Sequence, residues 1–150
     1  EVSDGLKNFS NIKGRLNIKQ GIKGATLIDD TYNANPDSMK AAIDVLAAMP
    51  APRIFVMGDM GELGEDEAAA MHAEVGAYAR DKGIEAAYFV GDNSVEAAET
   101  FGAEGLWFAD KDPLIQVLSH DLPERATVLV KGSRFMKMEE VVEALATTTA

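Results

Sequence analysis

Apolar runs and helical repeats alternate along this chain, and the alternation predicts an α/β fold. Five short runs of consecutive apolar residues are typical of strands that are buried on both faces. We expect these strands at ATLI (25–28), RIFVM (53–57), AAYFV (86–90), LWF (106–108) and TVLV (127–130). Because helical patterns separate the runs, the strands should form a parallel sheet covered by helices on both faces.

The segments between the strands carry the start and stop signals of helices. Asn35 can cap a helix that has Pro36 at its first position, and Gly83 and Gly102 stand where two helices should end. We expect helix starts at Pro36, Glu65, Ser94 and Asp112-Pro113, and a last helix around Met138, Val141, Val142 and Leu145. Met71, Val75 and Tyr78 should mark the buried face of the second helix.

The first part of the chain does not follow this pattern. RLNIKQ and the segment around Ile22 predict either an antiparallel ribbon or a linker that enters the domain. We therefore expect a junction over residues 1–24, one α/β domain over 25–147 and a frayed tail over 148–150. Because the first residue is Glu rather than Met, we interpret the chain as part of a longer protein.

Composition narrows the possible functions. The formal net charge of −11 argues against binding to nucleic acid or to an anionic membrane surface. There is no cysteine, so disulfides and thiolate chemistry are excluded. No apolar run approaches the length of a membrane span, and no signal peptide is visible at the start.

The ends of the predicted strands are polar, and this is where open α/β sheets bind ligands. The five ends read Asp29-Asp30, Gly58-Asp59, Gly91-Asp92, Ala109-Asp110 and Lys131-Gly132. For Asp92 and Asp110 we favour a role at a helix start, where aspartate is common. Around Asp30 and Lys131 more polar groups gather than capping requires, which favours a binding site.

The sequence contains none of the common motifs for phosphate binding, metal binding or a catalytic nucleophile. Neither G-x-x-x-x-G-K-[ST] nor G-x-G-x-x-G occurs, and the glycines of GDMGELG (58–64) have a different spacing. His72 and His120 lack ligand spacing and are more typical of surface or half-buried helix positions. No serine lies in G-x-S-x-G. We predict no metal ligand and no catalytic residue within this chain.

The segment KGSR (131–134) places two cations where a strand ends and a helix should begin. Such a combination can hold an anionic group, because a helix N-terminus and a guanidinium both favour negative charge. A capped helix with a solvated Lys and Arg would have the same sequence. The pattern alone leaves both interpretations open.

Three segments together resemble a known family. DDTYNANPDSMKAAIDVLA, VMGDMGELG and VLVKGSR with MEEVVEAL, in this order, are similar to the C-terminal domain of the Mur ligases. The resemblance implies a Rossmann-like, open and mostly parallel sheet with helices on both faces. Within the family, the motifs are most similar to those of the member that joins D-alanyl-D-alanine to UDP-N-acetylmuramoyl-tripeptide in the bacterial cytoplasm.

The resemblance also implies a division of labour. ATP and Mg²⁺ are the family's cofactors, and a central domain of the same chain carries the P-loop and most magnesium ligands. The C-terminal domain closes over ATP and presents the incoming amino acid or dipeptide, so that water is kept away from an acyl phosphate. By itself this domain should be inactive.

Four residues match family positions that contact the nucleotide. Arg15 matches an arginine that reaches the nucleotide, and Asp30 matches an aspartate that binds the ribose. Asn33 lies in the segment that lines the adenine side, and Asn35 is close by. The resemblance therefore implies an ATP site at Arg15, Asp30, Asn33 and Asn35.

Three further residues match the loop that touches the incoming amino acid. These are Lys131, Ser133 and Arg134, of which Arg134 suits the dipeptide carboxylate. Asp92 and Asn93 lie where a sister ligase has an arginine motif for another amino acid, and this chain lacks that arginine. For Asp59 and Glu62 in the 58–64 loop, the resemblance implies no role.

One alternative remains at the level of the sequence. A free-standing Rossmann-like or receiver-like regulatory module would bind a nucleotide or phosphate without a ligase partner. Asp29-Asp30, Asp59 and Lys131 loosely imitate the acidic pair, the phosphorylated aspartate and the lysine of a receiver. The length of the 58–64 loop fits this alternative poorly.

Overall fold

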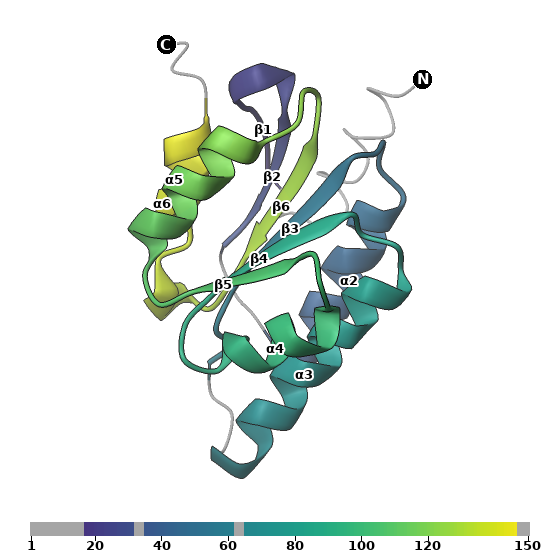
Figure 1. Ribbon diagram of the computed structural model, residues 1–150, viewed down its shortest axis with the longest axis vertical. Helices are drawn as coiled ribbons and strands as arrows, with labels where there is room; N and C mark the ends of the chain where they lie inside the picture. Colours follow the sequence, from purple (N-terminus) through teal and green to yellow (C-terminus); the bar gives the residue numbers. More distant parts are fainter. Residues whose placement is uncertain (1–16, 32–34, 62–64, 147–150) are drawn as a thin grey trace.

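The computed structural model describes residues 17–31, 35–61 and 65–146. In this part of the chain, six strands form one sheet in the order β1-β2-β6-β3-β4-β5 (Figure 1). The strands are β1 Asn17–Gln20, β2 Thr26–Asp30, β3 Arg53–Gly58, β4 Ala86–Val90, β5 Gly105–Phe108 and β6 Thr127–Lys131. The helices are α2 Pro36–Ala47, α3 Glu65–Asp81, α4 Ser94–Phe101, α5 Lys111–Asp121 and α6 Glu139–Leu145, with 3₁₀ turns η1 Ile22–Gly24 and η2 Arg134–Met136.

Strands β2 to β6 are parallel, and β1 is the antiparallel edge strand. β1 pairs with β2 in the register Ile18↔Ile28, so the chain enters the sheet as one strand of a ribbon. Of the two alternatives for this segment, the structure has the antiparallel ribbon. The domain boundary at residue 24 stays a prediction, although residues 17–20 belong to the same sheet.

Two helical layers cover the sheet. Helices α2, α3 and α4 lie on one face, where Ile43, Phe55 and Phe89 belong to a buried cluster. Helices α5 and α6 lie on the opposite face, where Val56 and Leu114 belong to a second cluster (Figure 1). Successive residues of β3 thus point into different layers, as the pleat of a strand requires. The predicted open, mostly parallel α/β fold is confirmed.

The three residues predicted for the buried face of α3 all pack against the core, but they are buried to different degrees. Val75 is fully buried, but Met71 and Tyr78 are only partly buried against the core. The Tyr78 hydroxyl donates to Asp44 Oδ1 at 2.6 Å, and this bond keeps the ring near the surface between α2 and α3. His72, which the sequence favoured as a surface or half-buried residue, is 0% exposed. Its burial has a cause in the functional site, described below.

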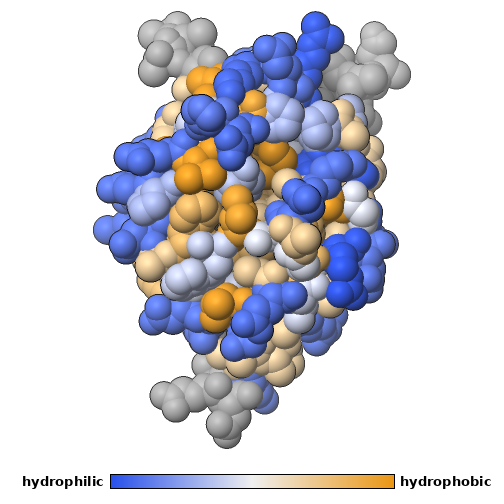
Figure 2. Space-filling model, in the orientation of Figure 1, coloured by the Kyte–Doolittle hydropathy of each residue, from blue (hydrophilic) through white to orange (hydrophobic). Residues whose placement is uncertain are grey.

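Hydrophobic side chains also reach the surface at the edge of the sheet. Leu106 and Trp107 of the edge strand β5 are 42% and 39% exposed, because no further strand covers that side in the described sheet. Figure 2 shows a largely hydrophilic face with scattered hydrophobic side chains towards its centre. None of the described helices is both long and apolar enough to cross a membrane.

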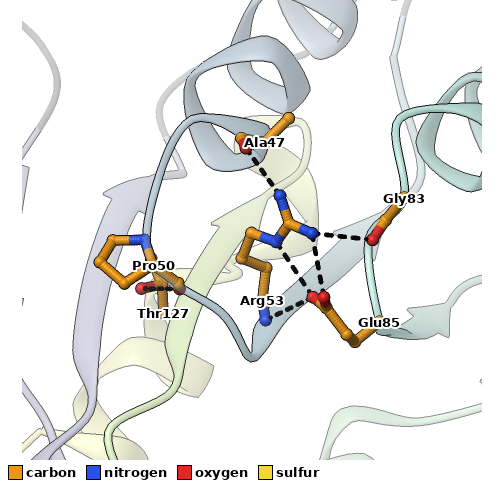
Figure 3. A network of polar contacts seen from close by, with 6 residues as sticks. All are labelled: Ala47, Pro50, Arg53, Gly83, Glu85 and Thr127. Carbon is orange, nitrogen blue, oxygen red and sulfur yellow. Dashed lines mark hydrogen bonds and ion pairs between the residues drawn. The ribbon is translucent and has the colours of Figure 1, made fainter.

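The end of the sheet where the parallel strands begin is held by Arg53 (Figure 3). Its guanidinium donates to Ala47 O at 2.6 Å, to Gly83 O at 3.0 Å and to both carboxylate oxygens of Glu85 at 3.0 and 2.9 Å. The Arg53 backbone N–H donates to Glu85 as well, at 2.8 Å. One side chain therefore joins the end of α2, the start of β3 and the turn after α3.

The Arg53–Glu85 pair should make stability depend on pH in one direction. Hydrogen bonds from Arg53 hold the pKa of Glu85 below its usual value. A lowered folded-state pKa stabilises the fold above the unfolded pKa, about 4.3, and this contribution is lost as the pH falls through the folded pKa. We expect Glu85→Gln to cost at most about 1 kcal/mol at pH 7, because the carboxylate is partly exposed.

Urea unfolding at pH 7 and at pH 3 measures this contribution. The difference between the wild type and Glu85→Gln should be present at pH 7 and shrink strongly at pH 3. Glu124→Gln, at an exposed position before β6, is the matched control and should show little change. An equal loss for Glu85→Gln at both pH values would contradict the assignment.

Candidate functional site

The topology has a switch point at the carboxyl end of β6. β6 leads to α6 on one face of the sheet, whereas its neighbours β2 and β3 lead to α2 and α3 on the other face. Open α/β sheets bind ligands outside the carboxyl ends of their strands, at the point where the following helices leave to opposite faces. Asp30, Asp59 and Lys131 stand at the ends of these three strands, so the structure brings them to one edge.

Asp30 and Lys131 form a buried ion pair at this edge of the sheet. Lys131 Nζ lies 2.9 Å from Asp30 Oδ2, and the two residues are only 2% and 5% exposed, respectively. Adjacent parallel strands position them, since Asp30 and Lys131 are register partners of β2 and β6. The pairing compensates two charges that would otherwise be costly to bury.

The second carboxylate oxygen of Asp30 has no hydrogen-bond partner among the described residues. Asp30 Oδ1 is buried without a hydrogen bond. An unsatisfied buried acceptor is costly, so such an atom points to a donor that the described protein does not supply. A ligand hydroxyl would serve, because an ionised carboxylate can only accept.

The neighbouring Asp29 has a different role. Its Oδ1 accepts from Thr31 Oγ1 at 2.8 Å, and its Oδ2 lies 3.3 Å from Lys19 Nζ of β1. Successive residues of a strand point to opposite faces. Both oxygens of Asp29 therefore have a protein partner, whereas Asp30 Oδ1 has none among the described residues.

Asn35 caps α2. Its side-chain oxygen accepts from the Ser38 backbone N–H at 2.9 Å, and Ser38 Oγ accepts from the Asn35 backbone N–H at 3.0 Å. This capping box confirms the predicted helix start, and it leaves the amide NH₂ of Asn35 as its remaining polar group. The predicted nucleotide contacts of Arg15 and Asn33 fall outside the described residues.

The segment after β6 brings the other predicted residues to the same edge. Ser133 is 7% exposed, and its backbone N–H donates to Asp59 O at 3.0 Å. Ser133 Oγ is a second buried polar atom that has no hydrogen-bond partner in the part of the chain that the structure describes. Asp30 neutralises the charge of Lys131 in the buried ion pair. The exposed cation of KGSR is Arg134, the first residue of η2.

Asp59 is a structural centre that the sequence did not reveal. Its Oδ1 accepts from the Ser94 backbone N–H at 2.9 Å and from Ser94 Oγ at 2.7 Å, and its Oδ2 accepts from Asn93 N at 3.1 Å. The end of β3 thereby holds the N-terminus of α4, a position that favours a carboxylate. A side chain at Gly91 (φ +113°) would place its Cβ 2.4 Å from Asp59 Oδ1. In the sequence, Gly91 directly after β4 was the one sign that another group approaches the backbone closely at this point.

His72 is buried because it holds the same loop. Its Nε2 accepts from the Met60 backbone N–H at 2.9 Å, so Nδ1 carries the hydrogen that is donated to Ala68 O at 2.7 Å. Both ring nitrogens are thus used in the neutral form. His72 Nε2 and Asp59 Oδ1 are 3.9 Å apart and do not form an ion pair, because Nε2 has no hydrogen.

The structure does not favour a receiver-like role. A receiver needs an aspartate that can accept a phosphoryl group, but Asp59 is only 6% exposed and holds three donors. Among the described residues there is no group of three or more His, Asp or Glu side chains arranged to hold a metal ion.

The fold defines the class first: an open, mostly parallel α/β domain with polar side chains gathered at the carboxyl edge of its sheet. The chain belongs to the Mur ligase family, since residues 14–134 match the family model described as "Mur ligase, glutamate ligase domain". This confirms the resemblance found in the sequence.

Relatives with known names are similar over nearly the whole chain. The UDP-N-acetylmuramoyl-tripeptide–D-alanyl-D-alanine ligase of Escherichia coli K12 is 46% identical over 146 residues, which are 96% of this chain and 32% of that protein. The enzyme of the same name from Haemophilus influenzae is 42% identical, over 97% of this chain and 32% of that protein. The chain thus spans about a third of the length of these relatives.

Solved structures of this family have a similar fold over most of the chain. The MurF ligase from Thermotoga maritima, in complex with ADP, has a TM-score of 0.76 at 27% identity and covers 87% of this chain and 30% of that chain. MurF from Acinetobacter baumannii has a TM-score of 0.76 at 34% identity, over 87% of this chain and 29% of that chain.

Proposed function

We propose that this chain is the C-terminal domain of a UDP-N-acetylmuramoyl-tripeptide–D-alanyl-D-alanine ligase. The observation that carries the proposal is the 46% identity over 96% of the chain to a relative of that name. The domain would close over ATP held by a central domain of the same protein, in the bacterial cytoplasm. It would position D-alanyl-D-alanine for attack on the activated carboxyl group of the tripeptide.

The nucleotide end of the site is proposed at β2. Asp30 Oδ1 is a buried acceptor without a partner, and a ribose hydroxyl is a donor of suitable chemistry. The ADP complex of a structural relative supports nucleotide binding in this family. Asn35 would contribute its amide NH₂, and Arg15 and Asn33 remain proposed nucleotide contacts.

The dipeptide end is proposed at residues 131–134. Lys131 would act through its ion pair with Asp30, which fixes the end of β6. Ser133 Oγ would hydrogen-bond the dipeptide, and the Arg134 guanidinium would hold its carboxylate. Mg²⁺ would be held mainly by the central domain, so this domain alone is proposed to be inactive.

Phosphate release by the full-length protein tests the proposal. It should require ATP, UDP-N-acetylmuramoyl-tripeptide and D-alanyl-D-alanine together. We expect Arg134→Ala to raise the KM for the dipeptide roughly 10-fold to 100-fold, the effect of losing a charge-assisted hydrogen bond, with little change in the KM for ATP. Arg134→Lys should lose less, because it keeps the charge but not the planar fork.

Two results would count against this function. Phosphate release that does not depend on the dipeptide would remove the proposed substrate. An Arg134→Ala enzyme with an unchanged KM for the dipeptide would remove residue 134 from the site while leaving the ligase activity itself in place.

A further inference from the structure

An aromatic ring stands exposed at the same edge of the sheet. Phe135 is 65% exposed, more than the other exposed large hydrophobic side chains, Leu106 and Trp107, among the described residues. It lies on η2, against the loop after β3: a Cβ built at Gly61 would lie 3.1 Å from the Phe135 ring and 3.3 Å from Ser133 Cβ. The ring therefore borders the segment that carries the buried hydroxyl of Ser133.

The turn that carries Phe135 is held from several sides. Lys111 Nζ of α5 donates to Met136 O at 2.8 Å and to Lys137 O at 3.3 Å. The same ammonium lies 2.9 Å from Glu140 Oε1 and lowers the pKa of that carboxyl group. Met138, which follows the turn, is completely buried. Phe135 is thus presented to solvent by a braced turn, and its exposure is a property of the folded domain.

Three consecutive residues here offer three kinds of contact. Ser133 supplies a buried hydroxyl without a hydrogen bond, Arg134 an exposed cation and Phe135 an apolar ring. A ligand that matches all three is small, carries a carboxylate and a polar backbone group, and has apolar substituents. The chemistry of a short peptide of small amino acids fits this set.

The position in the sheet separates this ligand from the nucleotide. Asp30 ends β2, whereas Gly61 and Phe135 lie on the side of β3. β6 stands between β2 and β3, so the two strand ends are roughly 10 Å apart at the usual strand spacing. A nucleotide bound at Asp30 would therefore leave the surface beside Phe135 available to a second ligand.

We propose that Phe135 is a specificity-determining contact for the methyl side chains of D-alanyl-D-alanine. This inference rests on the proposed function and adds a residue to it. The ring would be covered by the two methyl groups when the dipeptide binds, so removal of either the ring or the methyl groups should weaken binding.

The experiment compares D-alanyl-D-alanine with glycylglycine, which lacks both methyl groups, in the full-length enzyme. The kcat/KM ratio of the two dipeptides measures how strongly the methyl groups are recognised. We expect Phe135→Ala to reduce this ratio about tenfold, through the KM for D-alanyl-D-alanine, with an unchanged KM for ATP. Phe135→Leu should retain part of the preference, and Leu106→Ala, at an exposed apolar residue of β5, should change nothing.

The possible outcomes are distinct. An unchanged dipeptide preference in Phe135→Ala would overturn the inference and leave the proposed function intact. An increase confined to the KM for ATP would assign the ring to the adenine and would also overturn it. A wild-type enzyme without dipeptide-dependent phosphate release would overturn the proposed function, and the inference with it.

Discussion

Replacing Lys131 by Met should destabilise the domain by about 3–5 kcal/mol, the usual cost of breaking a buried ion pair on one side. The Asp30 carboxylate would stay buried at the end of β2 without its partner, from which it is now 2.9 Å away. A loss of this size is a large part of the stability of a small domain. Urea unfolding of the single variant measures it.

A double-mutant cycle separates stability from ligand binding. Asp30→Asn combined with Lys131→Met removes both charges, so we expect it to recover most of the lost stability. It should not recover ATP binding, because the neutral amide of Asn is a weaker acceptor for a ligand hydroxyl than the carboxylate.

The full-length double variant should therefore be folded but have a KM for ATP raised about tenfold or more. Asp92→Asn, at an exposed aspartate after β4, is the control and should leave both properties unchanged. A double variant as unstable as Lys131→Met, or one with the KM for ATP of the wild type, would contradict this account.

Gly76→Ala should destabilise the domain by about 1–3 kcal/mol or more, although alanine is the better helix former. Gly76 lies where α3 crosses α4. A Cβ there would lie 2.1 Å from the Ala97 backbone oxygen and 2.4 Å from Thr100 Oγ1. Backbone cannot move aside as a side chain can, and the Thr100 hydroxyl already donates to Ala73 O across the crossing at 2.7 Å.

The test is whether Gly76→Ala lowers or raises the stability of the domain. Helix propensity alone predicts that Gly76→Ala gains about 1 kcal/mol. Ala70→Gly, at an exposed position of the same helix, measures that propensity and should lose about the same amount. Thermal unfolding of both variants decides the question, and a stabilised Gly76→Ala protein would show that the helices separate at little cost.

Strands and helix ends that depend only on residues close together in the sequence could be predicted from the sequence. The apolar run AAYFV predicted a strand at 86–90, and β4 occupies those residues. Asn35 and Pro36 predicted a helix start, and in the structure the Asn35 side chain caps α2 by accepting from the Ser38 backbone N–H. Serine and glycine at the ends of 94–101 likewise marked α4. These signals depend on local backbone preferences, which act within one turn or one strand.

The functions of single polar residues required the tertiary structure. Asp59 and Ser94 are 35 residues apart, and nothing local connects them until β3 and β4 lie side by side. His72 had the sequence context of a surface residue but is buried against Met60, twelve residues away. Phe135 carried no signal in the sequence, because the exposure of this η2 residue depends on how the loop after β3 packs against it.

By itself, the sequence determined the order of strands and helices, the polar character of the strand ends and the family resemblance. Only the tertiary structure decided which polar groups meet: Asp30 pairs with Lys131, 101 residues further along the chain, whereas Asp29 pairs with Lys19 of β1. The physical reason is the range of the interactions. Apolar periodicity and helix caps act between near neighbours in the chain. The ion pairs and the unpartnered buried oxygens depend instead on which strands lie side by side in the sheet.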